Sequence, residues 1–146
     1  MSTYLTFMTA GVSFGAELSD VIRIIPSHEA EVSPAPNFPA YMPGTAAIDG
    51  EAVPVVDTAA RFGLGEKITG QRACCILSRL DHSSGMADRY DRCAVLVDEV
   101  TGIVSSEGLS HAPALNSESF ARYVKGTFID NNITYYVITP ELLVGD

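Results

Sequence analysis

Residues 41–64 read YMPGTAAIDGEAVPVVDTAARFGL, and this stretch decides the fold. Gly44 and Gly50 occupy turn positions on either side of a short apolar run. Residues 52–56 then predict a strand. Pro54 restricts that strand to a sheet edge or a bulge, because proline has no backbone N–H to donate to a neighbouring strand.

The same stretch also predicts a helical turn. Asp57 follows the strand, and its side chain can cap a short helix over residues 58–62. Gly63 ends that helix because glycine adopts the left-handed conformation at low cost. Physical reading of the stretch therefore gives a compact β-rich unit with a one-turn helix.

Short alternating segments on both sides of this stretch predict further strands. They span residues 3–9, 12–18, 72–78, 93–104, 122–129 and 132–138. Asp130-Asn131 is a plausible tight turn between the last two, and Pro140 begins a final helical turn. Ten or so short strands with almost no helix are typical of small barrels.

Three segments between these strands are less regular. Residues 21–25 allow either one helical turn or the start of a strand. Residues 26–43 contain five prolines, a density that predicts an extended surface connection. The polar, turn-rich residues 64–71 predict a boundary between two subdomains.

Composition excludes several classes of protein. The net charge is −9, and the nine basic residues are scattered, which argues against binding to nucleic acid or to an anionic membrane surface. No apolar stretch approaches the roughly 18 to 20 residues that a transmembrane helix needs. The amino terminus lacks the features of a secretory signal, so we expect a soluble cytoplasmic protein.

Cysteines and histidines give no strong sign of metal or catalytic chemistry. Cys74, Cys75 and Cys93 are an odd set without zinc-site spacing, which favours buried reduced thiols. On a strand, Cys74 and Cys75 face opposite sides. The histidines are scattered over separate predicted loops: His28, His82 and His111. We expect no metal and no cofactor.

The whole stretch resembles the signature of the CheW family of chemotaxis coupling proteins. That signature runs Tyr/Phe-x-x-Gly-Val-x-Asn-Leu-Arg-Gly-x-x-x-Pro-Val-x-Asp-Leu, followed by Phe-Gly-Leu. Further segments resemble family motifs in the right order, namely Leu5-Thr-Phe7, Leu96-Val-Asp-Glu-Val100, Tyr123-Val-Lys-Gly126 and Pro140-Glu-Leu-Leu143. The resemblance covers essentially the whole chain.

The resemblance implies a fold. It is all-β, with two small five-stranded SH3-like barrels packed side by side, sharing an apolar seam, and one or two short helical turns. Residues 1–146 would form a single CheW-like domain with its subdomain boundary near residues 64–71. The end of the chain would pack back on the first subdomain.

The resemblance also implies a function without catalysis. Family members bind the signalling tip of a chemoreceptor and the regulatory domain of a CheA-type histidine kinase. They do so as adaptors in the cytoplasm, in receptor arrays at the inner face of the membrane. The chain would therefore not be an enzyme and would not insert into the membrane.

Carried over by motif, five apolar residues would line the receptor-binding groove: Leu5, Leu18, Val21, Ile24 and Val100. Ordinary core packing is the alternative for each of them. A helix docking in a groove needs such an apolar strip and little else.

Two charged positions depart from the family pattern. Asp49 stands where the signature has arginine, and Arg23 stands where a Val-x-Glu-Ile motif has glutamate. Since those two positions often form an ion pair in the family, we expect Arg23 and Asp49 to form the same pair with its charges exchanged. Unrelated surface changes are the alternative. The chain is identified as a divergent member of the family.

Other functions remain open from sequence. One is a CheW-like accessory of the receptor array, or a binding module for another signalling assembly. Another, of a different class, is a small hydrolase or metal protein built from the histidines and cysteines, which their scatter disfavours.

Overall fold

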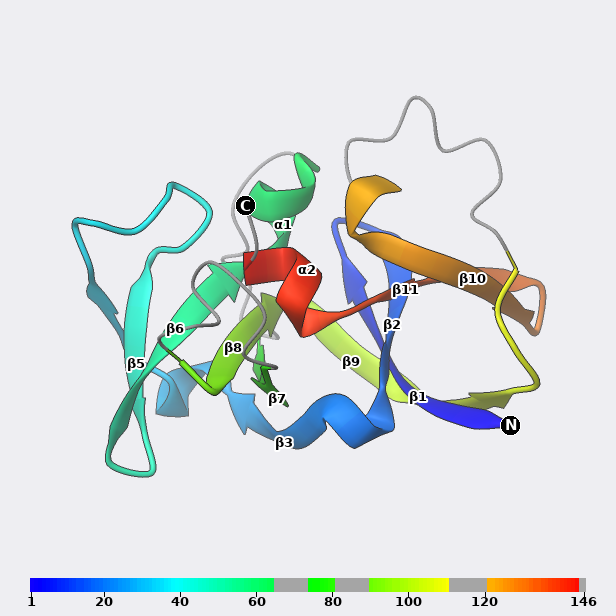
Figure 1. Ribbon diagram of the computed structural model, residues 1–146, viewed down its shortest axis with the longest axis horizontal. Coiled ribbons are helices and arrows are strands. Elements are labelled where there is room, and N and C mark those ends of the chain that lie inside the picture. Colours follow the sequence, from blue (N-terminus) through cyan, green and yellow to red (C-terminus); the bar gives the residue numbers. More distant parts are fainter. Residues whose placement is uncertain (65–73, 81–89, 111–120, 145–146) are drawn as a thin grey trace.

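The protein is described by a computed structural model over residues 1–64, 74–80, 90–110 and 121–144. In these residues the chain forms two β-sheets, two short α-helices and short 3-10 turns (Figure 1). The prediction of an all-β fold with one or two helical turns is confirmed.

The first sheet joins the two ends of the chain. Its strands, in spatial order, are β10 (Val124–Asp130), β11 (Ile133–Ile138), β2 (Val12–Glu17), β1 (Ser2–Thr9) and β9 (Glu99–Ser106). β1 and β2 form the predicted hairpin, and β11 pairs with β2 in parallel. The carboxy-terminal strands therefore complete a sheet begun by the amino-terminal ones.

This sheet curves round a small core of its own. Tyr4, Phe128, Tyr135 and Val137 are buried together on one side of it. The rings of Tyr4 and Phe128 stack with their centroids 4.9 Å apart. Beyond β9, a bridge between Ser110 and Thr127 links the chain back to β10.

The second sheet holds six strands in the described residues. In spatial order they are β3 (Val21–Pro26), β7 (Cys74–Arg79), β8 (Arg92–Val97), β6 (Glu51–Asp57), β5 (Gly44–Ile48) and β4 (Val32–Pro34). Side chains from all six contribute to a single apolar cluster, Val32 of β4 and Ile25 of β3 included. Because both edge strands contribute to it, the sheet curves round this cluster.

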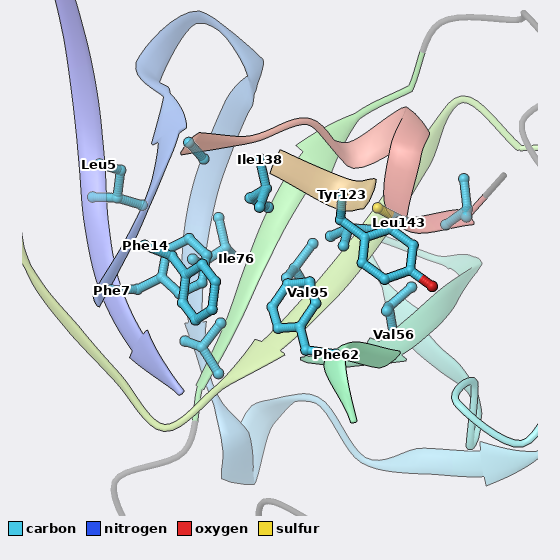
Figure 2. Close-up of a cluster of buried hydrophobic side chains, with 14 of the residues drawn as sticks. Leu5, Phe7, Phe14, Val56, Phe62, Ile76, Val95, Tyr123, Ile138 and Leu143 are labelled. Atoms are coloured by element: carbon cyan, nitrogen blue, oxygen red, sulfur yellow. The ribbon is translucent and has the colours of Figure 1, made fainter. Parts of the chain in front are cut away.

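A third and larger cluster forms the seam between the two sheets. Leu5, Phe7 and Phe14 come from the first sheet, and Ile76 and Val95 come from the second (Figure 2). Burying each such side chain is worth about 1.5 to 3 kcal/mol. The seam therefore makes the two sheets one folding unit.

Both helices pack on this seam. α1 (Thr58–Phe62) begins where the Asp57 carboxylate accepts a hydrogen bond from the Ala60 N–H at 3.3 Å, and it ends at Gly63 with φ of 68°. Phe62 stacks on Phe14 with ring centroids 4.8 Å apart. α2 (Pro140–Val144) buries its last two residues in the same cluster. Both predicted helical turns are therefore present.

Some details differ from the expectation. The second sheet has six strands and not five, because the proline-rich segment contributes the three-residue strand β4. Residues 21–25 belong to a strand and not to a helical turn. The last hairpin turns at Asn131 and Asn132, with φ of 52° and 65°, one residue later than predicted. Asparagine tolerates positive φ better than most residues.

The prediction for Pro54 was wrong in placing its strand at an edge. β6 lies between β8 and β5, with no bulge at Pro54 in its pairing with β5. Its pairing with β8, however, covers only the residues from Val55 to Asp57. Proline is therefore tolerated because it precedes the part of the strand that is paired on both sides.

The chain does not change sheets where the sequence predicted a subdomain boundary. Most of residues 64–71 lie outside the described residues, but the flanking strands β6 and β7 belong to the same sheet. The chain leaves the first sheet at the 3-10 turn η1 (Leu18–Asp20) and returns to it at Asp98.

The three cysteines are buried free thiols. Cys75 faces the cluster of the second sheet, whereas Cys74 and Cys93 face the seam. The opposite orientation predicted for the adjacent pair is therefore present. Burial raises the pKa of Cys75 to about 12 and also raises the pKa values of Cys74 and Cys93.

Candidate functional site

The chain passes from the first sheet to the second through η1 and β3, which lie along the lower side of Figure 1. Leu18 in η1 is 37% exposed, and Ile22 and Ile24 in β3 are 37% and 44% exposed. Val21 is half-buried and packs against the seam cluster. Neighbouring exposed aliphatic side chains are typical of a protein-binding surface.

A bulge in β3 determines which of these side chains face the seam. Val21 lies opposite Ser78 of β7. Ile24 lies opposite Ile76, because the register shifts by one residue between Val21 and Arg23. Residues three apart on a regular strand face opposite sides. The extra residue therefore brings Val21 and Ile24 to the same side, that of Ile76 in the seam.

In the first sheet, β9 contains a similar bulge in its pairing with β1. Val100 lies opposite Phe7, and Ile103 lies opposite Leu5. A register shift leaves Thr101 as the extra residue, so Val100 and Ile103 both share a side with the seam residues of β1. Val100 is half-buried, but Ile103 is 62% exposed.

The structure places the five predicted groove residues in two settings. Leu5 of β1 is part of the seam cluster, and Val21 of β3 and Val100 of β9 are half-buried and pack against it. Leu5 is only 3% exposed, so it supports the surface from below and does not present one itself. Leu18 and Ile24 are exposed next to Val21 in the chain.

Ile22 and Ile103 are two exposed residues that sequence reasoning missed. Ile103 and Val104 are adjacent aliphatic residues in β9, and the sequence alone does not show which strand lies opposite them. Only the pairing with Leu5 shows which side it faces.

The predicted contact between the exchanged charges is present. Arg23 Nη2 lies 2.6 Å from Asp49 Oδ1. Both side chains are about half exposed, at 48% and 56%. An exposed pair of this kind contributes little to stability, in the range of about 0 to 1 kcal/mol.

Arg92 joins this pair, which sequence reasoning did not anticipate. Its guanidinium lies 3.7 Å from the other carboxylate oxygen of Asp49 and also pairs with Glu51. The Arg92 side chain is only 16% exposed. It therefore balances two acids, Asp49 in the β5–β6 turn and Glu51 directly after it.

Two glycines fix that hairpin. Asp49 and Gly50 form its turn with φ of 54° and 81°, the double positive φ of a type I′ turn. At Gly44 a Cβ atom would lie 1.9 Å from the carbonyl oxygen of Ser33. Glycine is required there because β4 and β5 approach too closely for a side chain.

Metal and acid–base chemistry find little support. His28 is exposed, 3.6 Å from the carboxylate of Glu29, while His82 and His111 lie outside the described residues. Within the described ranges, no three His, Cys, Asp or Glu side chains are grouped to hold a metal ion. No helix in these ranges is long and apolar enough to cross a membrane.

Fold and surface together define a β-rich protein built around an apolar seam, with exposed apolar side chains at its margin. The CheW-like domain family matches residues 3–146, and the chain belongs to that family. Proteins of this family are non-catalytic scaffolds and adaptors of chemotaxis, so the chain is not an enzyme.

A solved structure has the same fold. The crystal structure of the scaffolding protein TtCheW from Thermoanaerobacter tengcongensis superposes with a TM-score of 0.81 at 17% sequence identity. The match covers 97% of this chain and 91% of that chain. A comparison with curated protein sequences finds no match.

Proposed function

We propose that this protein couples a chemoreceptor to a CheA-type histidine kinase as a non-catalytic adaptor. It would act in the cytoplasm, within receptor arrays at the inner face of the membrane. Membership of the CheW-like family supports the scaffold role. The choice of partners rests on the apolar surface between the sheets.

The observation that carries this proposal is a set of side chains that we call the docking strip. It consists of Leu18, Val21, Ile24, Val100 and Ile103, with Leu5 buried beneath it. A receptor's helical hairpin presents apolar residues every three or four positions along one face. A strip of exposed aliphatic side chains beside a rigid seam is what such a face can dock against.

Reconstitution from purified components tests the coupling. The chain would be mixed with a receptor hairpin tip and the full-length CheA-type kinase of the same organism. We expect a ternary complex in size-exclusion chromatography, and kinase activity that depends on the receptor only when the chain is present. Binding to neither partner by a folded sample would contradict the proposal.

A second candidate function is an array accessory that docks on a receptor without activating the kinase. The exchanged charges of Arg23 and Asp49 favour it, because inverting an ion pair near an interface selects against the usual partners. In the same reconstitution, this alternative predicts receptor binding without any gain in kinase activity.

A further inference from the structure

The turn η1 lies on the surface of the protein. None of its three residues is buried, and the side chain of the preceding residue, Glu17, makes no capping hydrogen bond to it. One backbone hydrogen bond, from the Val21 N–H to the Leu18 carbonyl, closes the turn. η1 carries Leu18 and leads into Val21, so its order matters to two of the five residues of the docking strip.

Two side chains from different sheets bond to η1 and to the residue before it. Lys125 of β10 pairs with the Glu17 carboxylate at 2.5 Å, just before the turn. Arg79 of β7 donates a hydrogen bond from Nη1 to the carbonyl oxygen of Ser19 at 2.8 Å, inside the turn. Carbonyls at the end of a helical turn lack intrahelical donors, and a basic side chain commonly supplies one.

The position of Arg79 explains why it reaches Ser19. It ends β7, one residue beyond Ser78, which lies opposite the first residue of β3. Arg79 is therefore next to the segment that precedes β3. It also lies opposite Arg92 in β8.

Like charges opposite each other on neighbouring strands repel. The guanidinium of Arg92 pairs with Glu51 and Asp49. The guanidinium of Arg79 instead bonds with the Ser19 carbonyl of η1.

We propose that Arg79 is a positioning residue for the docking strip: by holding the Ser19 carbonyl, it keeps η1 formed and so presents Leu18 and Val21 to the receptor helix. The effect on receptor binding rests on the proposed function, but the ordering of η1 by Arg79 can be tested without any partner.

The expected size of the effect follows from the population of the ordered turn. If η1 is formed only a tenth to a third of the time without Arg79, the apparent affinity falls by the same factor, about threefold to tenfold. A loss of general stability would instead affect amides throughout the seam.

The test compares Arg79→Gln and Arg79→Lys with a control, Arg122→Gln. Arg122 is an exposed arginine in the 3-10 turn η5 (Ala121–Tyr123), just before β10, and its Nε donates a hydrogen bond to the Tyr123 hydroxyl. Hydrogen exchange of the Val21 amide, which bonds to the Leu18 carbonyl, reports the opening of η1. Exchange of the Val95 amide in β8 reports general stability. Affinity is measured by titration with a soluble fragment containing a chemoreceptor hairpin tip.

For Arg79→Gln we expect Val21 exchange to rise several-fold, Val95 exchange to stay unchanged, and affinity for the tip to fall about threefold to tenfold. For Arg79→Lys, Val21 exchange and affinity should lie between those of Arg79→Gln and the wild type. For Arg122→Gln, both should match the wild type. Unchanged exchange at Val21, or an equal rise at Val95, overturns the inference.

Faster exchange with full affinity overturns the role in docking. If the wild type does not bind any tip, the proposed function itself fails, and the docking role of Arg79 fails with it.

Discussion

Arg23 and Asp49 form an ion pair between β3 and the β5–β6 turn, with 2.6 Å between their charged atoms. The pair carries the reverse of the charges that the family resemblance predicts at these positions. Because both side chains are about half exposed, its value for stability is small. Its importance lies in the charge pattern it sets beside Ile24 on the same strand.

A double-mutant cycle on this pair should give a coupling energy below about 1 kcal/mol. The variants are Arg23→Ala, Asp49→Ala and the double change, compared by urea unfolding. A coupling energy of several kcal/mol would mean that the pair is shielded from water and contradict its exposure.

A variant in which the two charges are exchanged should be less stable than the wild type. Asp49→Arg places a new cation beside Arg92, which lies 3.7 Å from the Asp49 carboxylate. Arg23→Glu with Asp49→Arg should therefore remain less stable than the wild type. Adding Arg92→Gln should recover part of the loss, because it removes the repulsion. Full recovery by the double exchange alone would show that Arg92 does not sense residue 49.

Glycines 44 and 50 should differ in their tolerance of a methyl group. Gly50→Ala adds only backbone strain at φ of 81°, with open space around the Cβ, and should cost about 1 to 2 kcal/mol. Gly44→Ala forces a Cβ against the Ser33 carbonyl and should cost clearly more, above about 3 kcal/mol. Thermal unfolding of both variants checks the order, and a reversed order would contradict the close approach of β4 and β5.

Removing a ring from the seam should destabilise both sheets together. Phe62→Ala deletes a fully buried ring that stacks on Phe14, at a cost of about 3 to 5 kcal/mol. Urea unfolding should still show one transition when followed at probes in each sheet. Two separate transitions in the wild type would contradict a shared seam.

Alkaline pH should weaken the fold through the buried thiols. A thiol ionises near pH 9 in the unfolded chain, but burial raises the pKa of Cys75 to about 12 in the folded one. Between these values the folded state binds more protons, so the free energy of unfolding falls as pH rises. The slope from Cys75 approaches about 1.4 kcal/mol per pH unit. In Cys75→Ala this part of the slope should disappear, and an unchanged slope would contradict the assignment.

Local sequence signals were enough for some elements. Asp57 and Gly63 mark the two ends of α1 through interactions with residues three or four positions away. The pairing of Arg23 with Asp49 followed from the family resemblance. Such features depend on neighbours in the chain or on a pattern of residues already visible in it.

Features that depend on strand pairing could not be read from the sequence. Val21 and Ile24 face the same side only because β3 pairs with β7 through a bulge. Ile103 faces the side of the seam residues of β1 only because of the register of β9 with β1. The crossing between sheets at η1 carries no composition signal, whereas the strands on either side of the polar residues 64–71 belong to one sheet.

The central claim is that the docking strip binds a receptor helix, and Ile24→Asp tests it most directly. Ile129→Asp is the matched control: Ile129 is 71% exposed and pairs with Thr134 near the start of β11, far from the end of β2 that leads to Leu18. A charge placed in a desolvated contact costs several kcal/mol, whereas one on an open surface costs little. Titration with a chemoreceptor hairpin tip should show at least a tenfold loss of affinity, about 1.4 kcal/mol, for Ile24→Asp and none for Ile129→Asp. Wild-type affinity in a folded Ile24→Asp variant would contradict the account.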